Sequence, residues 1–184
     1  DGATVLNEDV TINLAADTFG EDIVIEGLTG RGKLHLVGFY GSTQFAGSVR
    51  LRNCTNTIIL ENMTVYSAVS SSEGLIHAES CADVRLIAPR LDGANNRPAI
   101  TSDRSIVTVK SGPISNCTEC FRAKNLGQIY AYDTYGVGNG TGAFADSGSK
   151  IVMAYRKPKA TTVKSESNGG VVLDSATATG STFS

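Results

Sequence analysis

Two carboxylic acids, Glu79 and Asp103, are spaced in this 184-residue chain so that they could share one reaction. They occupy matching positions in successive copies of a short repeat, IHAES and ITSDR, and Arg122 follows in the next copy. A pair of carboxylic acids can cleave a glycosidic bond, one as the acid and the other as base or nucleophile. An arginine beside an acidic sugar could instead support a lyase reaction by proton abstraction.

The same column of residues also has a purely structural explanation. Each end of this column pairs two opposite charges, in the order Arg52, Glu79, Asp103 and Lys124. Such pairs limit repulsion between neighbouring strands, and at a surface each contributes only about 0–1 kcal/mol. We therefore favour a solvated ladder of charges and assign no catalytic residue. His77 is likewise expected to be a surface residue rather than a base.

Short alternating strands that recur every 21–27 residues would position these side chains. One column of apolar residues advances by 27, 24, 21 and 23 residues: Val49, Ile76, Ile100, Phe121 and Phe144. A second column advances by 27, 23, 22 and 22 residues: Thr57, Val84, Val107, Ile129 and Ile151. Because alternate residues of a strand share a face, both columns are expected to point into a narrow aliphatic core.

This period predicts an all-β solenoid. A leucine-rich repeat would need the LxxLxLxxN pattern, and a propeller blade would need about twice the period. Since parallel crossovers run right-handed, the expected fold is a single-stranded right-handed parallel β-helix. We expect N-terminal strands and an irregular first coil in residues 1–45, with strands at 22–27 and 33–38 paired around the LTGRG turn. Regular coils should fill 46–160, and a last strand and polar tail, leading to a further domain, 161–184.

Composition and charge narrow the range of partners. The 16 Lys and Arg against 18 Asp and Glu leave a net charge of −2, so no overall attraction to nucleic acid is expected. No run of about 18 apolar residues occurs, which argues against membrane insertion. Cys117 and Cys120 form a CxxC without the second ligand pair of a zinc site, so no metal and no cofactor is expected. The four cysteines should be packing residues or form one local disulfide.

The outward residues of the second strand are unusually apolar. On the expected register the strip contains Ile58, Leu60, Ile87, Tyr130, Tyr132 and Val152. A contiguous apolar strip usually marks an interface, here between copies of the chain, unless another segment of the same chain folds over it. Tyrosines can also stack against sugar rings, which makes Tyr130, Tyr132 and Tyr155 candidates for saccharide binding.

Three segments, GFYGSTQFAGSVRLRNCTNTIILENMTV, SIVTVKSGPISNCTECFRAKNLGQIYAYDTY and SNGGVVL, together resemble a known family. They are similar to the β-helix segments of tail or baseplate minor structural proteins of bacteriophages and prophages, especially of phages infecting Gram-positive bacteria. The resemblance spans residues 22 to 173 and is carried by the style of the repeat. It implies an elongated homotrimeric virion appendage, assembled in the host cytoplasm beside other tail proteins, that binds a bacterial surface polysaccharide without catalysis.

Two alternatives stay open. Some β-helical tailspikes are depolymerases, and related folds include lyases and hydrolases; Glu79, Asp103 and Arg122 would then be the candidate catalytic residues. However, the chain lacks the NTD, GHG and RIK motifs of polygalacturonases and the calcium-binding aspartate cluster of pectate lyases. The third possibility is a passenger domain of a secreted bacterial adhesin.

Overall fold

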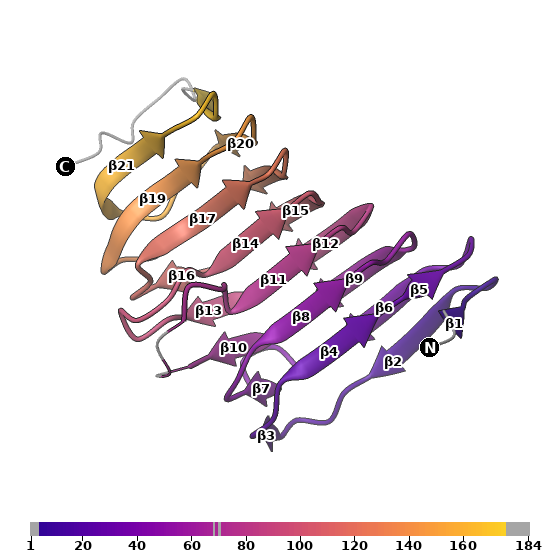
Figure 1. Ribbon diagram of the computed structural model, residues 1–184. Helices are drawn as coiled ribbons and strands as arrows, with labels where there is room; N and C mark the ends of the chain where they lie inside the picture. Colours follow the sequence, from indigo (N-terminus) through magenta and orange to yellow (C-terminus); the bar gives the residue numbers. More distant parts are fainter. Residues whose placement is uncertain (1–3, 68, 70, 176–184) are drawn as a thin grey trace.

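Parallel strands stacked one turn above the next form the whole described chain. The computed structural model describes residues 4–67, 69 and 71–175, and this part contains only strands, turns and loops (Figure 1). The strands form a β-solenoid of about seven turns, which confirms the predicted fold class. No helix in the described ranges is long and apolar enough to cross a membrane.

Two long sheets make the main walls of the solenoid. The seven-stranded sheet contains β4 (Ile23–Glu26), β8 (Val49–Arg52), β11 (Ile76–Glu79), β14 (Ile100–Asp103), β17 (Glu119–Lys124), β19 (Asn139–Ala145) and β21 (Ala160–Glu166). The eight-stranded sheet contains β2 (Val10–Asn13), β6 (Leu34–Val37), β9 (Thr57–Glu61), β12 (Asp83–Ile87), β15 (Ile106–Lys110), β18 (Gln128–Tyr132), β20 (Lys150–Ala154) and β22 (Val171–Ser175). Each full turn thus contributes one strand to each of these two walls, and β22 adds a further strand to the eight-stranded sheet.

A shorter sheet forms the third wall. Its five strands are β3 (Thr18–Phe19), β7 (Gln44–Phe45), β10 (Thr64–Tyr66), β13 (Arg90–Asp92) and β16 (Ile114–Ser115). A two-stranded sheet pairs β1 (Thr4–Val5) with β5 (Leu28–Thr29). The expected pairing of the strands at 22–27 and 33–38 is wrong, because β4 pairs with β8 while β6 lies between β2 and β9. The polar tail expected after the last strand lies outside the described residues from 176 onward.

Sharp corners separate the walls, and the sequence supplies residues that tolerate them. A residue with positive φ directly follows most strands of the two long sheets; examples are Asn53 after β8, Asn125 after β17 and Asn62 after β9. Asparagine enters this left-handed region at lower cost than most side chains. The corner after β20 places Tyr155 in the same conformation, with φ at 64°. These corners fold each turn back onto the one before.

The first predicted core column is correct except at its last member. Val49, Ile76 and Ile100 stack in register and are buried, and Phe121 continues the column. The next turn pairs Phe121 with Ala143, so Phe144 lies on the outer face and its expected place in the core is wrong. There its ring lies 6.0 Å from the Arg122 guanidinium carbon.

The second column is correct from its second member onward. Val84 pairs with Ile58 instead of Thr57, and Ile58 and Leu60 are 0% and 2% exposed. Both side chains therefore belong to the core, and their expected place on the outer apolar strip is wrong. In the apolar run Ile58–Ile59–Leu60, either face of the strand could point into the core by alternation alone. Pairing with the next turn decides between the two registers, because it sets Ile58 beside Val84.

Residues 71–75, the segment that leads into β11, cover part of the seven-stranded sheet. Buried Arg97 holds this segment by donating hydrogen bonds to the carbonyl oxygens of Glu73 (3.3 and 3.1 Å) and Gly74 (3.0 Å). Arg122 donates to the Ser72 carbonyl oxygen at 2.8 Å. His77 lies beneath this cover, 4% exposed, so its expected surface position is wrong. Burial lowers the pKa of its imidazole below the usual 6.5.

Candidate functional site

An open hollow on the outer face of the eight-stranded sheet brings the three candidate tyrosines together. We call it the tyrosine hollow; it encloses about 660 Å³ and is lined by Ile106, Thr108, Lys110, Tyr130, Tyr132 and Tyr155. The sequence placed Tyr130 and Tyr132 on one strand face, and the corner after β20 brings Tyr155 beside them. The sequence did not indicate the contribution of β15.

Strand register positions the rings of the tyrosine hollow. Tyr130 and Tyr132 are alternate residues of β18, so their side chains leave the same face about 6.6 Å apart along the strand. On one side they face Thr108 and Lys110 of β15, and on the other side small residues of β20. The tyrosine hollow lies on the β15 side of the two rings, since Thr108 and Lys110 line it and the small residues of β20 do not.

The polar groups of the tyrosine hollow suit a hydroxyl-rich ligand. The Tyr130 hydroxyl donates to the Gln128 side-chain oxygen at 2.7 Å, which fixes the orientation of this phenol. Lys110 is exposed and has no ion pair with any described residue. A fixed aromatic ring beside a free ammonium group and the Thr108 hydroxyl offers both an apolar face and hydrogen-bonding groups.

The outer apolar strip is narrower than expected once Ile58 and Leu60 join the core. Its remaining candidates Ile87, Tyr130, Tyr132 and Val152 lie on the outer face and are partly buried. Arg85 projects from the same face on β12, the strand between β9 and β15, and pairs with Asp83 at 2.7 Å. The strip is therefore a group of patches rather than one continuous surface, and the homotrimer stays a prediction.

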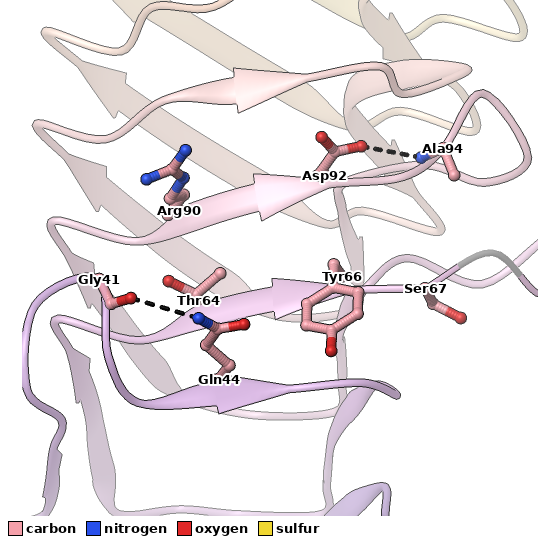
Figure 2. A pocket seen from close by; sticks show the side chains of 8 residues that line it. All are labelled: Gly41, Gln44, Thr64, Tyr66, Ser67, Arg90, Asp92 and Ala94. Atoms are coloured by element: carbon pink, nitrogen blue, oxygen red, sulfur yellow. Dashed lines mark hydrogen bonds between the residues drawn. The ribbon is translucent and has the colours of Figure 1, made fainter. Parts of the chain in front are cut away.

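A second hollow lies on the outer face of the five-stranded sheet, and the sequence reasoning missed it. We call it the arginine hollow; it encloses about 440 Å³ and is lined by Gly41, Gln44, Thr64, Tyr66, Ser67, Arg90, Asp92 and Ala94 (Figure 2). Strand pairing sets Thr64 beside Arg90 and Tyr66 beside Asp92. Strands of two or three residues carry almost no periodic signal, so no sequence pattern marked this wall.

The acidic candidates are brought together as the alignment predicts. Glu79 and Asp103 are register partners on β11 and β14. Glu79 lies 3.5 Å from Arg52 and 3.3 Å from Arg104, and buried Asp103 lies 3.2 Å from Lys124. Each carboxylate thus faces basic side chains of its own column and neighbouring corner, as a charge ladder requires.

Arg122, the third catalytic candidate, is engaged elsewhere. Its guanidinium pairs with the Glu119 carboxylate and reaches the Ser72 carbonyl oxygen of the covering loop. In this arrangement the guanidinium fixes the loop to the sheet. The hydrogen-bond donors of this guanidinium are therefore used by Glu119 and Ser72 and not by Glu79 or Asp103.

The four cysteines lie in the core as free thiols. Burial raises the pKa of Cys117 to about 12, and it also raises the pKa of Cys120. With their thiols kept protonated, Cys117 and Cys120 are poor nucleophiles and poor metal ligands. Among the residues that the structure describes, no three His, Cys, Asp or Glu side chains are grouped so that they could hold a metal ion.

Comparisons with known proteins give no relative for this chain: no protein-family model, no curated protein and no solved structure matches it significantly.

Proposed function

We propose that this β-solenoid is a non-enzymatic saccharide-binding protein that uses the tyrosine hollow. The observation that carries the proposal is the convergence of Tyr130, Tyr132 and Tyr155 on one open surface beside the unpaired Lys110. Aromatic rings contribute large apolar area at low conformational cost, and their hydroxyls can bond to the polar edge of a ligand. A pyranose ring has an apolar face and a polar rim, so it fits both features.

The rigidity of the wall favours binding of a repeating polymer. Tyr130 and Tyr132 project from a central strand paired on both sides, and Tyr130 is also held by its hydroxyl. Little side-chain entropy remains to be lost on binding, which preserves more of the contact energy. Because the hollow is open, a long glycan could lie across it without threading its end into a closed cavity.

We place this activity in a virion appendage, as a tail or baseplate component that binds a bacterial surface polysaccharide. The support is the resemblance of the repeat to phage tail β-helix segments together with the solenoid architecture. Self-association as a homotrimer belongs to the same proposal and draws on the partly exposed patches around Ile87 and Val152. Light scattering that shows a monomer at micromolar concentration would remove the trimer and leave saccharide binding to be judged separately.

Replacing Tyr130 and Tyr132 together by alanine should abolish most saccharide binding. The probes are intact Gram-positive cell walls and an array of neutral bacterial surface oligosaccharides, followed by calorimetry on the strongest array ligand. Removing two stacked rings should weaken the affinity about tenfold or more, because each ring contributes on the order of 1 kcal/mol.

Two matched variants give this experiment its specificity. Tyr130→Phe keeps the ring and should lose far less affinity than Tyr130→Ala. Phe39→Ala removes a ring that is 70% exposed but lies outside the tyrosine hollow, and it should bind as the wild type does. Equal losses at Phe39 and at the two tyrosines, or full binding by the double variant, would exclude the tyrosine hollow as the site.

A further inference from the structure

We propose that the arginine hollow is a second and separate binding site, which takes a sugar residue carrying a carboxylate group. Arg90 would pair with the carboxylate, and Asp92 would accept hydrogen bonds from hydroxyls of the same sugar. The two residues lie two positions apart on β13 and both line the hollow (Figure 2). This site faces a different wall from the tyrosine hollow and does not depend on it.

The first support is an arginine without a partner. The Arg90 side chain is exposed, and its guanidinium forms no ion pair or hydrogen bond with any described residue. Most other arginines here are engaged: Arg104 lies 3.3 Å from Glu79, and Arg156 pairs with Asp133 through two hydrogen bonds. A planar guanidinium with all its donors free matches the two oxygens of a carboxylate.

The second support is a hydroxyl beside Arg90 that has no partner. The Oγ1 atom of Thr64 is buried and makes no hydrogen bond, although Thr64 lines the hollow. Thr64 and Arg90 are register partners on β10 and β13, and Figure 2 shows them at the same end of the hollow. An unsatisfied buried hydroxyl carries a free-energy cost that a ligand oxygen would remove.

The opposite end of the hollow offers fixed acceptors and an aromatic face. Asp92 is held by hydrogen bonds from the Ala94 backbone nitrogen and the Asn116 side-chain nitrogen, both at 3.0 Å and one to each oxygen. Each carboxylate oxygen can accept a further bond, so sugar hydroxyls still find acceptors there. The Tyr66 ring stands next to Asp92 on the neighbouring strand.

Charge favours a carboxylate over a phosphate group. Arg90 is the one unpaired cation among the lining residues, while Asp92 lies about 6.6 Å further along the same strand. A dianionic phosphate would meet one positive and one negative charge, whereas a singly charged carboxylate can be paired by Arg90 alone. The preferred ligand is therefore a uronate residue of an acidic polysaccharide.

The test compares a glucuronate-containing disaccharide with its carboxyl-reduced, neutral counterpart, using calorimetry or NMR titration of the full chain. The acidic disaccharide should bind about tenfold or more tightly than the neutral one. Arg90→Gln should remove this preference, Arg90→Lys should keep part of it, and Arg31→Gln, the same charge change at an exposed position outside the hollow, should keep all of it. Because Arg90 is exposed, melting curves of the variants should match the wild type.

Several results would overturn this proposal. These are equal affinity for the acidic and neutral disaccharides, full acid preference in Arg90→Gln, loss of it in Arg31→Gln, or no binding of the acidic disaccharide. Equal binding of glucose 6-phosphate would exclude the carboxylate as the preferred group. The double alanine variant at Tyr130 and Tyr132 should keep the acid preference, so failure at one hollow is distinguishable from failure at the other.

Discussion

Replacing Ile58 by aspartate is expected to abolish folding, whereas the same replacement at Ile59 should leave a folded protein. Ile58 is 0% exposed on β9 and packs in the core column below Val84. A carboxylate at this depth has no basic partner, and such substitutions cost about 4–5 kcal/mol or more. Ile59 faces outward in register with Arg85, so an aspartate there meets a cation and costs about 1 kcal/mol.

Circular dichroism and thermal unfolding of the two variants measure this difference. The expected result is a native β spectrum with a cooperative transition for Ile59→Asp, and an unfolded or aggregated chain for Ile58→Asp. The opposite pattern would place Ile58 on the outer strip, as the sequence alone predicts. Equal effects would contradict both registers, because one of two adjacent residues in a strand must face away from the core.

Replacing Gly136 by alanine should produce the second-largest loss of stability. The added Cβ atom would lie 1.9 Å from the carbonyl oxygen of Ile114 in the turn below, and φ at this position is +136°. The chain cannot easily move aside, because Lys159 donates a hydrogen bond to the Gly136 oxygen from the turn above. Backbone strain and steric overlap together should cost on the order of 4 kcal/mol.

Gly41→Ala provides the matched control for this prediction. Gly41 also has positive φ, at +75°, but nothing lies within 4 Å of an added Cβ atom. Its replacement should therefore cost only the conformational term of about 1–2 kcal/mol. Chemical denaturation of both variants gives the two free energies of unfolding. Equal losses would mean that stacking of the turns does not restrict position 136.

The sequence predicted the period and most of the core columns because the same apolar positions recur in successive repeats, so that one unclear repeat does not hide the pattern. Val84 and Val107 are each separated by a polar residue from the next core position, so their direction was determined. Ile58 was misassigned because three consecutive apolar residues fit either face. Phe144 was misassigned because adjacent Ala143 and Phe144 are both apolar, and strand pairing rather than residue size decides which points inward.

A periodic pattern does not predict contacts between segments that lie far apart in the sequence. His77 occupies an outward position of β11, yet it is buried because residues 71–75 fold over the sheet and are held there by Arg97. The arginine hollow arises where three short strands align, and none of them repeats a recognisable motif. The tyrosine hollow was partly predictable, since Tyr130 and Tyr132 share a face by alternation alone.

An NMR titration of protein labelled at its six tyrosines tests the central claim most directly, because it shows which rings contact a saccharide. The ligand is the neutral oligosaccharide that binds most strongly on the array. We expect the ring signals of Tyr130, Tyr132 and Tyr155 to shift together in a saturable manner, while the signals of Tyr40 and Tyr66 stay unchanged. Saturable shifts at Tyr40 or Tyr66 with unchanged signals for the other three rings would contradict saccharide binding in the tyrosine hollow.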